Sequence, residues 1–306
     1  MTVVTTAPDR DLIWRSKVEE FGGAADRPLD GLPPPAAAWW PGWQLFSTYA
    51  AALVSCENAD GSPSGDVGAG TTGQVHASTI AAAGALQDQL AAAVEDQSGN
   101  ARSITSAAAA AAPKLFDQAT ARFVQQNLSL VLGYDVARAM TRGDALGLAA
   151  DPALTIAFKT RFATIGVGLA PNVLALGDAV TPELCLFGTR TASPADGISL
   201  TSFDGAFGAS WILPVNTIDK LHSYVVTKPA GTGYDASTWK LLIDGVDQGP
   251  PSNSPGTLAL GSALTQLGDV PGGGFGLDGT LAGMIVWASV LDAGALTQLQ
   301  AFLDSV

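Results

Sequence analysis

The C-terminal third of the chain is built from short apolar runs that are separated by turn-forming residues. In Trp239–Gly245 the side chains of Trp239, Leu241 and Ile243 fall on every second position, so they share one face of a strand. The run ends in an Asp-Gly dipeptide, which tolerates the positive φ of a tight hairpin. Leu221–Lys228 divides its side chains between two faces in the same way. This pattern predicts antiparallel strands that are joined by short turns.

Earlier runs extend the pattern through the second half of the chain. Leu154–Phe158 carries its large apolar residues on alternate positions. Asn172–Leu176 and Leu184–Phe187 are continuous apolar runs, as in strands that are buried on both faces. Many short strands with frequent turns predict an all-β antiparallel sandwich. The clearest turns lie at residues 195–197, 249–251 and 271–274.

A few segments carry helical rather than strand periodicity. Apolar residues at helical spacing predict a short helix within residues 76–94, and Ala107–Ala112 predicts a turn of helix or a packed linker. Asp292 is predicted to cap a final helix near the C-terminus. The apolar stripe of that helix consists of Leu296, Leu299 and Leu303.

Length and composition exclude several classes of function. The chain has 306 residues, enough for one large sandwich or two small domains, and 47% of them are apolar. The net charge is −13 and no basic cluster occurs, so nucleic acid is disfavoured as a partner. No segment approaches the ~20 apolar residues of a membrane-spanning helix. Residues 1–15 lack the apolar core of a secretion signal, so we expect no membrane partner and no secretory route.

Cysteine and histidine are too few for most metal or nucleophile sites. Cys56 and Cys185 belong to no CxxC pair, so we expect two buried thiols, with a disulfide between them as the alternative. His76 and His222 are the two histidines, which rules out a multi-histidine metal site. The sequence also lacks a Gly-x-Ser-x-Gly elbow, so a serine nucleophile is not expected.

Residues 1–45 differ from the rest of the chain and are predicted to form an N-terminal arm. Residues 21–35 are rich in Gly and Pro, which sustain neither a helix nor a central strand. Trp39, Trp40 and Trp43 follow, and with Trp14 they are predicted to anchor the arm on a neighbouring subunit. Two alternatives stay open, because these rings could instead fold back on the sandwich or form a platform for sugars.

The residues after the arm carry a recognisable order of short motifs. Phe46–Asp60 is followed by Gly65–Gly68, then by Asp96–Asn100, which reads Asp-Gln-Ser-Gly-Asn, and by Ala112–Phe116. This order resembles the opening of arabinofuranosidase B-type catalytic sandwiches and a related module of bacteriophage virion proteins.

The later strands extend the resemblance to most of the chain. They resemble a laminin-G-like or concanavalin A-like sandwich, so the resemblance covers about residues 41–306. It implies a jelly-roll sandwich over residues 46–306, with an opening module at 46–117 and a laminin-G-like part at 150–306.

Some residues depart from the enzymes of this group. Val54–Glu57 replaces a basic stretch, Glu95 replaces a tyrosine, and no Cys-Cys nucleophile segment is present. Glycoside hydrolysis needs two carboxylates that flank the scissile bond, and no motif pairs the acids of this chain. We therefore expect a protein that is not an enzyme. The acids considered were Asp96, Glu183, Asp204 and Asp244.

Several Asp-containing turns have a structural and a functional interpretation. The residues of Asp96–Asn100 are turn formers and predict a structural corner, with a glycan or calcium contact as the alternative. Asp269 and Asp278 could contribute oxygen ligands to calcium, although their spacing is not diagnostic. No other cofactor is expected.

The leading prediction is a non-enzymatic bacteriophage virion protein, located in the virion as a capsid decoration or tail component. Its partners would be other virion proteins and copies of itself, reached through the arm. One alternative is an adhesin that binds host-surface glycan through Trp211, Tyr234 and Trp239, and another is a glycoside hydrolase.

Overall fold

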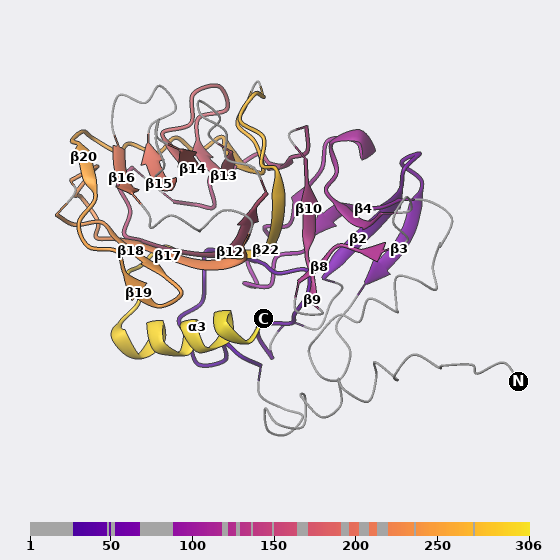
Figure 1. The fold of residues 1–306 in the computed structure, drawn as a ribbon, viewed down its shortest axis with the longest axis horizontal. Helices are drawn as coiled ribbons and strands as arrows, with labels where there is room; N and C mark the ends of the chain where they lie inside the picture. Colours follow the sequence, from indigo (N-terminus) through magenta and orange to yellow (C-terminus); the bar gives the residue numbers. More distant parts are fainter. Residues whose placement is uncertain are drawn as a thin grey trace, which may run out of the picture.

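The chain folds into an antiparallel β-sandwich with a helix packed beneath it (Figure 1). This architecture confirms the predicted all-β, concanavalin-like fold class. The computed structural model describes residues 27–47, 49, 53–67, 88–117, 122–126, 129–135, 137–148, 150–163, 171–190, 196–201, 208–212, 220–235, 237–271 and 273–306.

The upper layer in Figure 1 is a run of antiparallel strands in the order β20, β16, β15, β14, β13, β21, β11 and β5. The strands are β20 (Ser252–Ser254), β16 (Gly208–Ile212), β15 (Asp196–Thr201), β14 (Leu184–Arg190), β13 (Asn172–Gly177), β21 (Leu264–Leu267), β11 (Met140–Arg142) and β5 (Ile104–Thr105).

The lower layer runs β19, β18, β17, β12 and β22, and both β1 and β10 pair with the far edge of β22. β6 continues this layer from β10, and β7 pairs with β6. The strands are β19 (Val246–Asp247), β18 (Lys240–Ile243), β17 (His222–Lys228), β12 (Leu154–Phe162), β22 (Gly279–Trp287), β1 (Ala37–Trp39), β10 (Leu132–Tyr134), β6 (Lys114–Asp117) and β7 (Arg122–Phe123).

One strand belongs to both layers. β4 (Gln89–Val94) pairs with β5 of the upper layer through Ala93 and Val94, and with β6 of the lower layer through Gln89 and Leu90. β4 also pairs with β2, which pairs with β3, so these strands close one end of the sandwich. The remaining elements are β2 (Val54–Asn58), β3 (Pro63–Val67), β8 (Gln125–Gln126), β9 (Ser129–Leu130) and the 3-10 turn η1 (Ala109–Ala111).

The main core fills the space between the two layers. Strand alternation sends Leu174 and Leu186 inward from the upper layer, where they meet the lower layer. Phe158 on β12 stacks on Tyr224 of the adjacent β17, with ring centroids 4.9 Å apart. Trp239, which precedes β18, is also buried in this core.

A second core lies beneath the lower layer, under α3 (Ala293–Ser305). Asp292 caps this helix, because its Oδ1 accepts a hydrogen bond from the backbone N–H of Ala295 at 2.8 Å. The helix buries Leu299, Phe302 and Leu303, so the predicted cap and most of the predicted stripe are confirmed. Trp40 packs edge-on against Phe302, with centroids 4.9 Å apart.

Most of the expected strands are present. All five predicted apolar runs form β12, β13, β14, β17 and β18. Asp244 and Gly245 take φ values of +48° and +76° in the two-residue turn between β18 and β19, as the Asp-Gly dipeptide predicts. The helical turn at Ala107–Ala112 is also confirmed, as η1.

The helix predicted for residues 76–94 is wrong where the structure describes it. Residues 89–94 form β4, and residues 76–87 lie outside the described residues. Leu90 and Val94 are four residues apart, which fits a helix, but both are also buried in a strand that pairs with β2, β5 and β6. Pairing with three neighbours therefore outweighs the local helical pattern.

Candidate functional site

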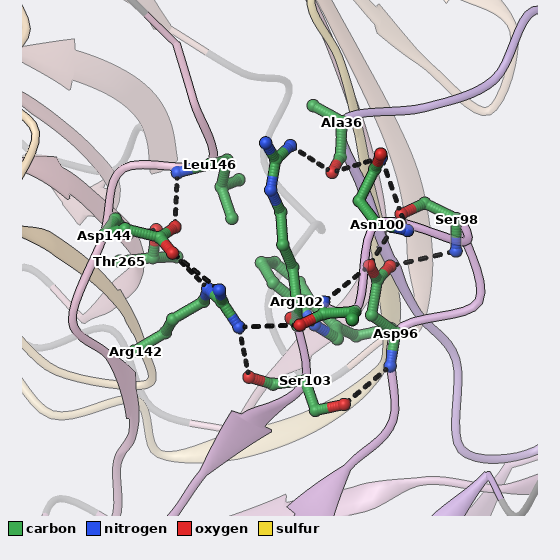
Figure 2. A network of polar contacts seen from close by, with 12 residues as sticks. Ala36, Asp96, Ser98, Asn100, Arg102, Ser103, Arg142, Asp144, Leu146 and Thr265 are labelled. Carbon is green, nitrogen blue, oxygen red and sulfur yellow. Dashed lines mark hydrogen bonds and ion pairs between the residues drawn. The ribbon is translucent and has the colours of Figure 1, made fainter.

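The Asp-Gln-Ser-Gly-Asn segment forms a structural corner (Figure 2). Asp96 is buried, and its Oδ1 accepts the backbone N–H of Ala38 and of Ser98, each at 2.9 Å. Its Oδ2 accepts the Ser98 hydroxyl at 2.6 Å and the Arg102 N–H at 2.9 Å. Four donors occupy this carboxylate, so the predicted corner explains Asp96 without a glycan or a calcium ion.

The same segment holds the chain around the tryptophans in place. Gln97 donates from Nε2 to the carbonyls of Trp40 and Trp43, at 3.0 and 2.9 Å, and its Oε1 accepts the N–H of Leu45 at 2.7 Å. Asn100 donates to the carbonyl of Pro35 at 2.9 Å. We call Asp96–Asn100 the clamp, because its side chains fasten residues 35–45 to the sandwich.

The tryptophans proposed as anchors pack within this chain. Trp39, the last residue of β1, packs in the main core, and Trp40, which follows it, packs in the core under α3. Trp43 is half-buried beside Phe302 at 6.5 Å, and Trp14 lies outside the described residues. The packing of Trp39, Trp40 and Trp43 corresponds to the alternative in which these rings fold back on the sandwich. Anchoring to another subunit stays a prediction.

The three aromatic residues named as candidates for glycan binding, with core packing as the other interpretation, also lie in the interior. Trp211, Tyr234 and Trp239 are each at most 3% exposed. Their polar atoms are used internally, since the indole N–H of Trp211 donates to Gly249 O at 2.9 Å and that of Trp239 to Gly233 O at 2.9 Å. Stacking on a sugar would require these rings to become exposed, so this role stays a prediction.

The other candidate acids have structural partners. Glu183 accepts backbone N–H groups from Asp178 at 2.9 Å and Gly261 at 3.0 Å. Burial raises the pKa of Asp244, but hydrogen bonds from His222, at 2.6 Å, and Ser223 outweigh it, and the pKa falls. Asp204 lies outside the described residues.

Burial raises the pKa of two carboxyls in the described part of the chain, Glu57 and Asp269, and Asp269 is the more buried of the two. It follows β21 in a Gly-rich loop, and its side chain is 7% exposed. Its Oδ1 accepts the N–H groups of Val270 at 2.8 Å and Phe275 at 3.1 Å. Burial raises its pKa, and these two hydrogen bonds lower it by less. Within the described residues, its Oδ2 makes no hydrogen bond.

The loop of Asp269 crosses the outer face of the upper layer. Val270 packs there on Ala175 and Cys185, which project from β13 and β14 away from the main core. Burial raises the pKa of the Cys185 thiol to about 12, so the thiol is neutral at pH 7 and is a poor nucleophile. Asn172 anchors the loop by donating from Nδ2 to the carbonyl of Asp269 at 2.7 Å.

Both cysteines are described, both are buried, and no disulfide joins them, as expected. The part of the chain that the structure describes contains no group of three or more His, Cys, Asp or Glu side chains that could hold a metal. Calcium binding at Asp269 and Asp278 stays a prediction. None of the described helices is long and apolar enough to span a membrane.

Among the solved structures that share this fold are arabinofuranosidases. No protein-family model and no curated protein matches the sequence. An arabinofuranosidase in complex with arabinofuranosyl-α-1,2-xylobiose is similar over 92% of this chain and 65% of its own, with TM-score 0.67 and 14% identity. A mutant GH54 α-L-arabinofuranosidase soaked with 4-nitrophenyl α-L-arabinofuranoside is similar over 89% of this chain and 63% of its own, with TM-score 0.65 and 13% identity.

This similarity corrects one expectation. The chain was expected not to be an enzyme, but the sandwich that it shares is the sandwich of glycoside hydrolases. The departures at Val54–Glu57 and Glu95 therefore do not separate this chain from that fold. This chain spans less than two thirds of the length of those enzymes.

Proposed function

We propose that this protein acts on carbohydrate as a glycoside hydrolase, with Asp269 as the acid that protonates the leaving group. The observation that carries the proposal is the environment of Asp269, a buried carboxyl with a raised pKa and an Oδ2 that makes no hydrogen bond to any described residue. The shared fold supports it, because the similar structures are arabinofuranosidases. An arabinofuranoside is therefore the first substrate to test.

The chemistry needs a carboxyl that is still protonated near the working pH. Cleavage of a glycosidic bond requires a proton on the departing oxygen, and a raised pKa keeps the acid protonated at higher pH. Oδ1 of Asp269 is held by two backbone N–H groups, so Oδ2 is the atom left to carry and deliver the proton. A second carboxylate must act on the other side of the bond, and we assign no residue to that role.

The test is hydrolysis of arabinofuranosyl-α-1,2-xylobiose by wild type and by Asp269→Asn, because its sugar leaving group departs only with a proton. The Asn side chain retains an oxygen that can accept the hydrogen bonds from Val270 and Phe275, so the loop is expected to stay folded. Removing the acid should lower the rate by at least a hundredfold, the usual contribution of general acid catalysis.

The matched control is Asp247→Asn. Asp247 also caps a Gly turn, because its Oδ1 accepts the N–H of Gly249 at 2.8 Å, but it is exposed on β19. This control should hydrolyse the substrate at the wild-type rate. A wild type that releases no arabinose, or an Asp269→Asn variant as fast as wild type, would contradict the proposal.

A place in a virus particle is a separate proposal, and it rests on the resemblance of residues 41–306 to the phage module. It is compatible with glycan chemistry, since a virion protein could act on host-surface carbohydrate. Because Trp39 and Trp40 are buried in this chain, the informative truncation removes residues 1–26 and keeps β1. The truncated protein should fold but fail to join particles, and normal incorporation would contradict a role for the arm.

A further inference from the structure

A row of polar side chains crosses three strands on the outer face of the upper layer. Thr105 on β5 lies opposite Thr141 on β11, and Thr141 lies opposite Gln266 on β21. Directly paired residues project from the same side of a sheet, with Cβ atoms about 5 Å apart. Gln266 also pairs with Ala175, which packs on Val270 outside the main core, so the row faces outward.

The row opens into a shallow recess of about 460 Å³. Two hydroxyl side chains of the row line it, beside the turn that follows β11. Its lining residues are Ser103, Thr105, Thr141, Arg142, Gly143 and Asp144.

Gln266 is the residue that points to a ligand. Its side chain is 8% exposed, and its amide makes no hydrogen bond within the described part of the chain. The amide can donate two hydrogen bonds and accept two. Neither of its polar atoms is among the fully buried atoms without a partner, so both stay accessible and a bound ligand can pair with them.

The charges at the recess cancel (Figure 2). Arg142 donates from Nε to Asp144 Oδ2 at 2.7 Å, and its Nη2 lies 2.6 Å from the same oxygen. Its Nη1 donates to the Ser103 carbonyl at 3.2 Å, and Asp144 Oδ1 accepts the N–H of Leu146 at 2.9 Å. The guanidinium is therefore neutralised and largely occupied. An anionic ligand would gain little here, whereas a neutral polyhydroxyl ligand can pair with the remaining groups.

We propose that the row and the recess bind a neutral sugar unit, as a subsite for a glycan chain that runs along β21 toward Asp269. Gln266 and Asp269 are three residues apart, and three residues span at most about 10 Å, so the end of the row lies near Asp269. The proposal deepens the proposed function and rests on it for the class of substrate.

The test is calorimetric titration with arabinofuranosyl-α-1,2-xylobiose, in the Asp269→Asn background to prevent turnover. Gln266→Met removes the amide and keeps the chain length, and Thr141→Val removes a hydroxyl and keeps the shape. Each should weaken binding on the order of tenfold, equivalent to about 1.4 kcal/mol. Gln248→Met is the matched control and should leave binding unchanged, because this partly exposed glutamine lies outside the row and its side chain bonds to Val246 O.

The outcomes separate the subsite from the catalytic proposal. Unchanged affinity in both Gln266→Met and Thr141→Val would overturn the subsite, even if wild type hydrolyses arabinofuranoside. Lost affinity in both variants without any hydrolysis by wild type would support the subsite and contradict the glycosidase. A clear loss of thermal stability in Gln266→Met would also overturn it, because the amide would then have a structural partner.

Discussion

The outer faces of the two layers differ in polarity: one is apolar and covered, and the other carries polar side chains. The outer face of the lower layer is apolar, with Ala157, Val225 and Ile285 covered by α3 and by the chain around Trp40. The outer face of the upper layer instead carries the polar row on β5, β11 and β21 and the loop of Asp269. Figure 1 shows α3 beneath β17 and β18, on the side away from β13–β16.

This difference shows how one fold separates stability from function. Because side chains alternate along a strand, each layer has an inner face toward the main core and an outer face away from it. On the outer face of the lower layer, a second hydrophobic core buries apolar side chains, which adds stability. The outer face of the upper layer carries Gln266 and Asp269, the groups proposed to bind and act on carbohydrate.

Removing a buried side chain from the covered lower face should give the largest loss in the free energy of unfolding. Trp40→Ala removes a fully buried ring that contacts Phe302, and we expect a loss of about 4 kcal/mol in the free energy of unfolding. Urea denaturation measures this loss. Sugar binding by the folded fraction should not change, because distant sites act additively. A parallel loss of sugar affinity would show that the two faces are coupled.

Breaking the clamp should cost somewhat less. Asp96→Ala leaves four donors without their acceptor, including the N–H of Ala38 on β1, and we expect a loss of about 3 kcal/mol. Hydrogen exchange should show faster opening of β1 than of β13. Asp235→Ala, in an exposed turn with Ser237, is the matched control and should lose much less. Equal losses would mean that the clamp contributes no more than an ordinary turn.

The sequence predicts the sandwich well where the information is local. Trp239, Leu241 and Ile243 alternate, and Asp244-Gly245 can adopt positive φ, so the β18–β19 hairpin follows from neighbouring residues. The α3 helix follows equally from the Asp292 cap and the leucine stripe. In contrast, β4 depends on pairing with three distant strands, so its local pattern was misleading.

The candidate site could not be found in the same way. Asp269 is one of many acids in turns, and its raised pKa comes from burial by residues that are distant in the sequence. Thr105, Thr141 and Gln266 become neighbours through strand register alone. The Gly-rich run after Asp269 marked a turn, but no motif indicated that the turn would carry a buried carboxyl.

Weakening α3 at its end should have a smaller effect, confined to the lower face. Asp292→Ala removes the N-cap acceptor for Ala295, and we expect a loss of about 1 kcal/mol by urea denaturation. Asp304→Ala is the matched control in the last turn, where a negative charge opposes the helix dipole, so it should lose less or gain. If Asp304→Ala cost more than Asp292→Ala, the cap would not be what secures this helix.

The smallest effect on stability is expected for Asp269→Asn on the polar face, and this substitution should stabilise the protein, whereas the others destabilise it. Because burial raises the pKa of Asp269, the folded state holds the proton more tightly than the unfolded chain does. The wild type therefore loses stability as pH rises from the ordinary carboxyl value of 3.8 through the raised pKa of the folded state. Asp269→Asn cannot ionise, so its stability relative to wild type should increase over that interval and then level off. Urea denaturation of both proteins at a series of pH values measures this difference. A difference that does not change with pH would show that Asp269 is not destabilised by burial, and the proposed acid would lose its physical basis. A difference that rises with pH would mean that the buried Asp269 carboxyl lowers the stability of the protein while its raised pKa keeps it protonated. The lower face would then contribute stability through Trp40 and α3.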